Sequence, residues 1–154
     1  KTASLSLIQY EVSNFAKADF QSRSNLKVWD GQPYLGLGCG AHSFDGVNRW
    51  GNVRSMRKYM ESVGREEPPR DFMETPTRLQ QASERLMLSL RRPEGLNILS
   101  WQEEFQIGLS LEQKNQMEKL KDQDLVSWES PILKLTTEGM LLADAITAEL
   151  MPEA

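Results

Sequence analysis

The sequence predicts an α+β fold, in which a short strand-and-loop segment at the N-terminus precedes a mostly helical, winged-helix-like module. Three observations predict this fold. Apolar and polar residues roughly alternate over residues 5–15, as in a half-buried strand. Apolar residues recur at helical spacing over residues 79–90. Two short apolar runs within residues 125–136 flank Ser130-Pro131, as the strands of a hairpin flank a turn.

The composition predicts a globular protein of the cytoplasm. The 154 residues are 39% hydrophobic and 26% charged, and no apolar run approaches the roughly 20 residues of a membrane-spanning helix. One cysteine cannot form an internal disulfide, which favours a reducing compartment. With one cysteine and one histidine, the chain also lacks the ligands of a Cys/His zinc site or an iron–sulfur cluster. We therefore predict no metal ligands.

The first part of the chain is predicted to contain few regular elements. Asp30-Gly31 and Pro33 are typical turn residues, Ser55 is a typical helix N-cap, and Gly64 is a typical helix stop. The predicted elements are a strand over 5–15 with Leu5, Leu7, Tyr10, Val12 and Phe15 pointing inward, a loop over 16–25, a short strand or turn over 26–29, a turn over 29–33 and a helix over 55–63. A linker over 65–70 divides the predicted domains, 1–64 and 65–154.

The second part is predicted to be helical with one hairpin. Thr75 and Pro76 suit a helix start, Ser100 with Glu103 has the form of a capping box, and Ser110 is a further N-cap. The predicted elements are helices over 75–91, 100–106 and 110–121, strands over 125–129 and 132–136, and a last helix that Thr136 or Thr137 caps. Trp101 and Trp128 are expected in the core.

Residues 34–43 (Tyr-Leu-Gly-Leu-Gly-Cys-Gly-Ala-His-Ser) are the most unusual stretch, because they hold three glycines, the only cysteine and the only histidine. Glycine at every second position leaves one face of an extended segment as bare backbone. Neither the dinucleotide-binding fingerprint nor a phosphate-binding loop is present. The stretch is therefore predicted to be a closely packed strand and turn, with a role in lining a binding site left open.

Several separate stretches resemble the oxygen-independent coproporphyrinogen III oxidase family of radical S-adenosylmethionine proteins (HemN/HemW-type), in particular its haem-chaperone branch. Residues 10–17 (Tyr-Glu-Val-Ser-Asn-Phe-Ala-Lys) resemble the family's Tyr-Glu-Ile-Ser-Asn-Phe-Ala-Lys, and residues 34–43 resemble its Tyr-Leu-Gly-Leu-Gly-Pro-Gly-Ala-His-Ser. Residues 84–96 and 135–144 resemble two helices of its C-terminal module. The resemblance covers nearly the whole chain, but only the C-terminal part of such a protein.

The resemblance implies that the reactive part of the protein lies upstream. Family members carry a Cys-x-x-x-Cys-x-x-Cys motif whose thiolates hold a [4Fe-4S] cluster, to which S-adenosylmethionine binds. The strands before about Ser43 would then belong to the edge of an upstream radical SAM barrel. The full-length protein would be oxidoreductase-like, whereas this chain is expected to contribute no catalytic residue.

The resemblance also implies which residues bind the cofactor. The stretch that contains Gly38, Gly40 and His42 passes close to S-adenosylmethionine in the family, and a contact to the cofactor would fall at His42. The alternative interpretation is a closely packed strand with a structural histidine. Cys39 replaces the family's proline and is expected to be an inert, buried thiol.

Haem-chaperone members also carry His-Asn-x-x-Tyr-Trp, whose histidine is proposed to bind haem. Residues 24–29 (Ser-Asn-Leu-Lys-Val-Trp) keep Asn25 and Trp29, but serine and valine stand in place of the histidine and the tyrosine. Either haem is held by another residue, such as His42 or Cys39, or this branch binds haem weakly or not at all.

The resemblance implies a tetrapyrrole as the partner, either coproporphyrinogen III in an oxidase or haem in a chaperone. A winged-helix module that binds nucleic acid or another protein is the alternative function. Between residues 111 and 150, however, four basic residues stand against eight acidic ones, and the whole chain has a net charge of −4. Since nucleic-acid binding depends on basic side chains, we expect no nucleic-acid partner.

Overall fold

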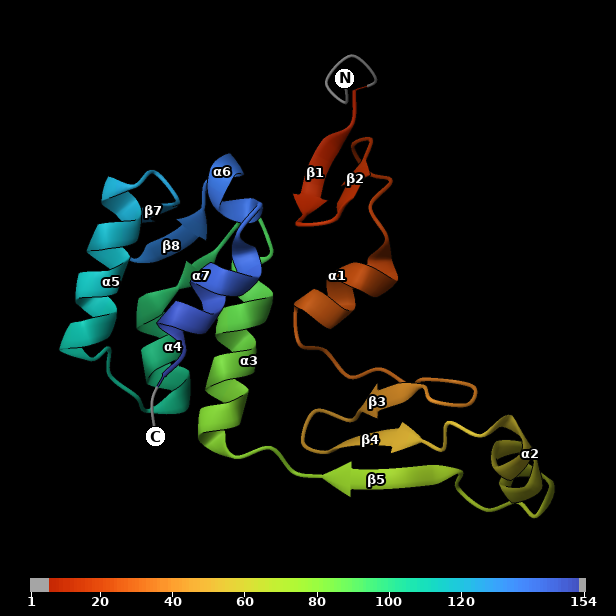
Figure 1. Cartoon of the computed structure of the whole chain (residues 1–154). Coiled ribbons are helices and arrows are strands. Elements are labelled where there is room, and N and C mark those ends of the chain that lie inside the picture. The colour runs from red at the N-terminus through yellow and green to blue at the C-terminus, as the bar shows by residue number, and fades with distance from the viewer. Residues whose placement is uncertain (1–5, 153–154) are drawn as a thin grey trace. The chain divides into compact units, whose positions relative to one another are not determined.

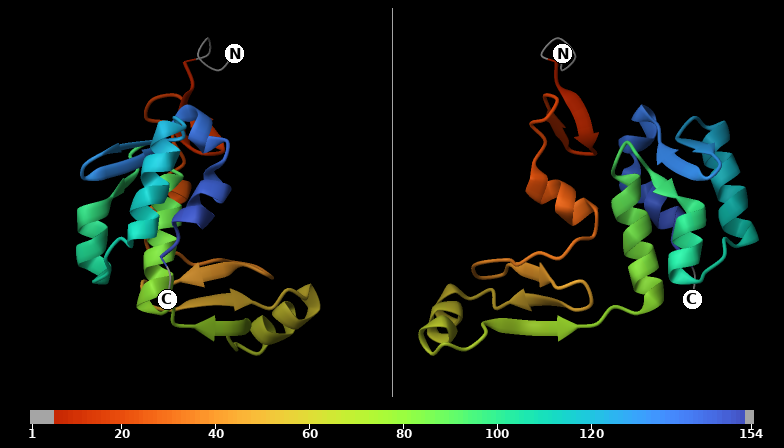
Figure 2. Two further views of the ribbon diagram at one scale, coloured as in Figure 1. Left: turned by 60° about the vertical axis from the view of Figure 1, so that its left-hand side comes forward. Right: turned by 180° about the vertical axis from the view of Figure 1, so that it is seen from behind.

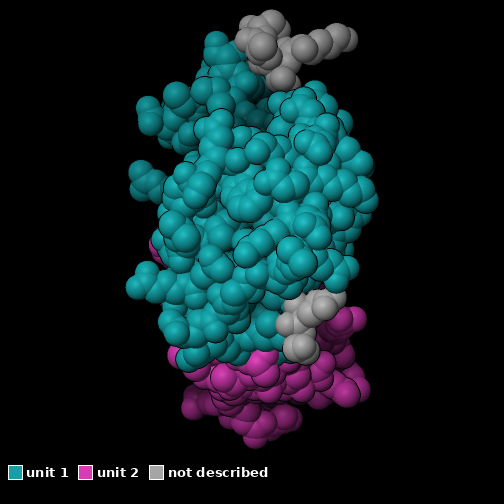
Figure 3. Space-filling model, turned by 90° about the vertical axis from the view of Figure 1, so that its left-hand side faces the viewer, with its two compact units in different colours: residues 1–30, 78–154 teal, residues 31–77 magenta. Residues whose placement is uncertain are grey.

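The computed structural model describes residues 6–152, which form a mixed structure of helices and strands without a closed barrel, and this confirms the predicted fold class. The described residues fall into two compact units (Figure 3). Unit 1 consists of residues up to Asp30 and from Arg78 onward, and unit 2 of Gly31–Thr77. The predicted boundary between domains 1–64 and 65–154 lies within unit 2. This division into domains stays a prediction.

Unit 1 contains a hairpin and a module with the succession of elements predicted for a winged helix (Figure 1, Figure 2). Its strands form one two-stranded sheet, β1-β2, and one three-stranded antiparallel sheet in the order β6-β8-β7. Its elements are β1 (Ile8–Glu11), β2 (Asn14–Ala16), α1 (Arg23–Trp29), α3 (Arg78–Leu90), β6 (Leu96–Asn97), α4 (Ile98–Phe105), α5 (Leu111–Asp122), β7 (Val126–Glu129), β8 (Ile132–Leu135), α6 (Thr137–Met140) and α7 (Ala143–Leu150).

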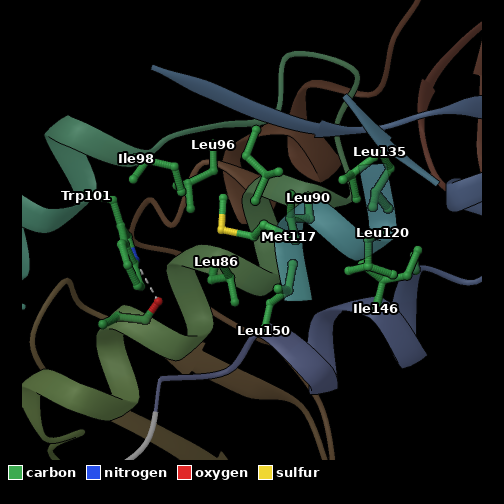
Figure 4. Close-up of a cluster of buried hydrophobic side chains, with 14 of the residues drawn as sticks. Leu86, Leu90, Leu96, Ile98, Trp101, Met117, Leu120, Leu135, Ile146 and Leu150 are labelled. Atoms are coloured by element: carbon green, nitrogen blue, oxygen red, sulfur yellow. Dashed lines mark hydrogen bonds between the residues drawn. The ribbon is translucent and has the colours of Figure 1, made fainter. Parts of the chain in front are cut away.

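The hydrophobic core lies in the helical module of unit 1 (Figure 4). Trp101 is 1% exposed, as expected of a core residue, and its indole Nε1 donates a hydrogen bond to the Ala82 carbonyl at 2.9 Å. This bond satisfies the polar atom of a large buried ring and ties α4 to α3. The buried apolar residues are Ala82, Leu86, Leu90, Leu96, Ile98, Trp101, Phe105, Met117, Leu120, Val126, Leu133, Leu135, Ala143, Ile146 and Leu150.

Helix caps confirm some predicted boundaries and correct others. Ser110 and Gln113 form a capping box at the start of α5. The capping box predicted at Ser100 is wrong, because the side chain of Asn97 accepts from the Ser100 N–H and starts α4 earlier. The predicted last helix is interrupted, since α6 ends at Met140 and α7 begins only at Ala143.

The prediction for residues 23–29 is wrong, because α1 occupies Arg23–Trp29 in place of the end of a loop and a short strand or turn. Residues 17–22 are irregular, as predicted. Ser22 caps the helix by accepting from the Asn25 N–H at 3.3 Å. Its C-terminal end is held by residues distant in sequence. Asp30 pairs with Arg92, and its carbonyl accepts from Arg85 at 3.3 Å.

The inward residues predicted for the first strand are confirmed only in part, because Val12 packs against the hydrophobic core. Glu11 is buried, at 1% exposed, whereas Phe15 is 44% exposed. The predicted inward residue Leu5 lies outside the described residues. The chain turns back after β1, so the hairpin replaces the alternation expected of one longer strand.

Unit 2 is a three-stranded antiparallel sheet, β3-β4-β5, with one helix between its second and third strands. Its elements are β3 (His42–Phe44), β4 (Arg49–Asn52), α2 (Met56–Gly64) and β5 (Arg70–Glu74). Ser55 caps α2 as predicted. Strand β5 was not predicted from the sequence, because it forms by pairing with β4 and neither its length nor its composition marks it locally.

A glycine in α6 provides a test of the packing between α6 and Leu125, the residue before β7. A Cβ at Gly139 would lie 1.9 Å from the Leu125 carbonyl oxygen, whereas a Cβ at Gly108 would meet nothing within 4 Å. Gly139→Ala should therefore lower the free energy of unfolding by at least about 2 kcal/mol. Gly108→Ala is the matched control and should change it by less than about 0.5 kcal/mol. Urea unfolding measures both variants, and equal stabilities would contradict the packing described here.

Candidate functional site

The register of the sheet in unit 2 places the conspicuous residues of 34–52 in two rows. His42 pairs with Gly51, which pairs with Phe72. Neighbouring residues of a strand point to opposite faces of the sheet. We call the face with His42, Gly51 and Phe72 the histidine face, and the face with Ser43, Trp50 and Met73 the tryptophan face.

The histidine face presents an exposed imidazole beside an aromatic ring. The rings of His42 and Phe72 meet edge to face, with centroids 5.6 Å apart. Gly51 makes this arrangement possible, because a Cβ there would lie 2.5 Å from Phe72 Cε1. His42 is exposed, and neither of its ring nitrogens has a hydrogen-bond partner among the described residues. The imidazole is therefore available to a ligand.

Hydrogen bonds hold residues 36–40, which we call the glycine segment, against the tryptophan face. The buried side chain of Asn52 donates from Nδ2 to the carbonyls of Gly36 and Gly38, at 3.3 and 3.0 Å. The Gly36 N–H donates to Ser43 Oγ at 2.9 Å, and the Gly38 N–H donates to the Tyr59 hydroxyl at 3.1 Å. These four bonds give the segment a defined position that does not require a regular strand.

The glycines serve different purposes. Gly36 allows a close approach, because a Cβ there would lie 2.1 Å from the His42 carbonyl oxygen. Gly38 and Gly40 adopt φ values of +100° and +70°, which favour glycine. Since both backbone groups of Gly38 are bonded internally, a ligand would meet its bare Cα. The expectation of a buried thiol is wrong, because Cys39 is exposed in this turn-rich segment.

Asn25 and Trp29, the other two predicted cofactor-binding residues, lie in α1 of unit 1. The structure thus does not bring them into one compact unit with Gly38, Gly40 and His42. The Trp29 indole Nε1 is buried without a hydrogen-bond partner, and the Arg91 guanidinium lies over its ring at 5.7 Å from the centroid.

Glu11 is a buried carboxylate near the C-terminal end of α3, and it was not identified from the sequence. Oε1 of Glu11 is buried and has no hydrogen-bond partner among the described residues. The Val12 N–H donates to the Arg91 carbonyl at 2.9 Å, which fixes the hairpin at the end of α3. A residue of this kind in a strand with imperfect alternation gives no sequence signal, since charged residues are normally exposed.

The turn between β3 and β4 holds a carboxylate, Asp45, whose pKa is lowered by hydrogen bonds. The pKa of Asp45 is lowered from its ordinary value of 3.8, above all by the backbone N–H of Asn48, then by that of Val47 and by the Asn48 side chain. Among the described residues, no cluster of three His, Cys, Asp or Glu side chains could hold a metal ion. None of the described helices is long and apolar enough to cross a membrane.

Relatives with curated names match almost the whole chain. A Bacillus subtilis protein named "Heme chaperone HemW" is 31% identical over 146 residues, which are 94% of this chain and 38% of that protein. A Mycobacterium tuberculosis protein of the same name is 31% identical over 92% of this chain and 34% of its own length. The zebrafish (Danio rerio) protein "Radical S-adenosyl methionine domain-containing protein 1, mitochondrial" is 29% identical over 94% of this chain and 35% of its own length. No protein-family model matches the chain.

A solved structure shares the fold. It is described as "Coproporphyrinogen III oxidase (HemN) from Escherichia coli is a Radical SAM enzyme", and it matches with a TM-score of 0.76 at 16% sequence identity. The match covers 97% of this chain and 38% of that chain. The chain therefore spans little more than a third of the length of the proteins that it matches.

Filling the position between the two rings tests the histidine face. Gly51→Ala should displace the Phe72 ring, because the new methyl group would occupy its place. The His42 ring protons should then lose the ring-current shift that an edge-to-face neighbour imposes. Proton NMR measures this shift, with Gly64→Ala as a control at a position where a Cβ meets nothing within 4 Å. Unchanged His42 resonances in Gly51→Ala would contradict the placement of His42, Gly51 and Phe72 side by side on one face of the sheet.

Proposed function

We propose that this chain, which over nearly its whole length is similar to the C-terminal part of HemN/HemW-type radical SAM proteins, forms the rear wall of a haem-binding site. The single observation that carries the proposal is the match along 94% of the chain to a protein named as a haem chaperone. Haem is favoured over coproporphyrinogen III because the haem chaperone is 31% identical, whereas the coproporphyrinogen oxidase is 16% identical. The protein would act in the cytoplasm.

Radical chemistry is assigned to a part of the protein outside this chain. A [4Fe-4S] cluster takes three or four thiolates, and this chain has one cysteine. S-adenosylmethionine would supply the radical when it is bound to such a cluster. The present residues fit a contact with this cofactor at the bare Cα of Gly38 and at Gly40. His42, the other residue expected at this cofactor, is assigned to haem iron instead. None of these residues is proposed to be catalytic.

Unit 2 has the surface expected of a part that another domain completes. Among the residues that the structure describes, those of the hydrophobic core all come from unit 1. Large apolar side chains of unit 2 are exposed instead, including Met56 at 70% and Met60 at 62% in helix α2. Exposed apolar surface of this kind is typical of an interface, which favours the proposal that an upstream barrel packs against unit 2.

His42 is the residue proposed to hold haem iron. Serine at position 24 is a poor axial ligand, whereas imidazole is a common one. Asn25 and Trp29 stay proposed cofactor-binding residues on the resemblance to the haem-chaperone motif alone, and indole rings pack well on planar apolar groups.

A haemin titration tests this proposal. The Soret band of haemin should shift when haemin binds to the chain. His42→Ala should weaken haemin binding at least about tenfold, because the iron loses its protein ligand. Cys39→Ser is the matched control at the other exposed candidate ligand and should bind as the unchanged chain does. Absence of a Soret shift would contradict haem binding, and an unchanged shift in His42→Ala would remove His42 as the ligand.

A further inference from the structure

The tryptophan face of unit 2 contains a hollow that the proposed function does not use. Its volume is about 210 Å³, and its apolar wall includes Leu35, Leu37, Trp50, Pro68 and Pro69. An apolar cavity of about 150 Å³ holds benzene. The hollow is therefore large enough for one ring of benzene or pyrrole size.

A cation stands at the rim of this hollow. The Arg70 guanidinium lies over the Trp50 ring, with Cζ 4.8 Å from the centroid, and Nη1 lies 3.6 Å from Met73 Sδ. No carboxylate among the described residues pairs with Arg70. Stacking on the indole orients the planar guanidinium, and its remaining donors match the two oxygens of a carboxylate.

The other polar groups of the hollow leave one further donor. Asn52 has both side-chain amide hydrogens bonded to the glycine segment, at the carbonyls of Gly36 and Gly38. The Tyr59 hydroxyl accepts from the Gly38 N–H and keeps its own proton. Arg70 and Tyr59 both line the hollow and both donate, so the ligand they fit carries an acceptor.

We propose that this hollow binds a small ring that carries a carboxylate on a short flexible arm. The ring packs on Trp50 between Leu35 and Leu37, and the carboxylate accepts from Arg70. Such a group occurs as a free aromatic acid or as one pyrrole ring of a larger tetrapyrrole with its propionate. The second source rests on the proposed function, whereas the first does not.

Titration of the chain with 3-phenylpropionate, followed by NMR of the tryptophan indole N–H groups, tests the site. The Trp50 signal should shift saturably, and Arg70→Gln should weaken binding at least about tenfold by removing a charge-assisted bidentate pair. Arg70→Lys keeps the charge but not the planar guanidinium. Its affinity for 3-phenylpropionate should therefore lie between those of the unchanged chain and Arg70→Gln. The matched control is Arg57→Gln, since Arg57 is an exposed arginine of the same unit that pairs with Glu61.

Binding of related ligands shows whether the natural ligand is a free aromatic acid or one ring of a tetrapyrrole. The neutral 3-phenylpropanamide and acetate should each bind at least about tenfold more weakly, because each lacks one of the two groups that the hollow recognises. Coproporphyrin III that competes with 3-phenylpropionate identifies a tetrapyrrole ring as the natural ligand, and 3-phenylpropionate binding without this competition identifies a free acid. An unperturbed Trp50, equal affinity in Arg70→Gln, or an equal response to acetate would each overturn the proposal.

Discussion

The side-chain amide of Asn52 is the interaction on which the rest of unit 2 depends. It is buried in the sheet, and it donates to two carbonyls of a segment that has few regular hydrogen bonds of its own. Backbone bonds between Tyr34 and Phe44 and from Gly40 to Val53 fix the two ends of the segment, and the two bonds from Asn52 hold its middle in one position. That position closes one side of the hollow and leaves the imidazole of His42 exposed on the opposite face.

The sequence predicted the elements whose signals are local. Ser55 and Ser110 were identified as helix caps, because a cap depends on residues within one turn. The hairpin of β7 and β8 was predicted from two apolar runs with a proline between them. Residues 34–43 were singled out by composition alone, and the structure gives each of their glycines a stated steric or conformational reason.

The features that the sequence did not predict depend on partners far along the chain. Helix α1 is held by Arg85 and Arg92, more than fifty residues away, and β5 exists through its pairing with β4. The two faces of the sheet follow from the register among three strands, which no single stretch encodes.

Amide hydrogen exchange across residues 36–40 tests the central claim most directly. In the unchanged chain the amides of Gly38 and Gly40, which donate to the Tyr59 hydroxyl and the Val53 carbonyl, should exchange slowly. In Asn52→Ala they should exchange at least about tenfold faster, since loss of the two side-chain bonds frees the segment. Equal exchange rates in the two proteins would show that Asn52 does not hold the segment in place, and would contradict the account.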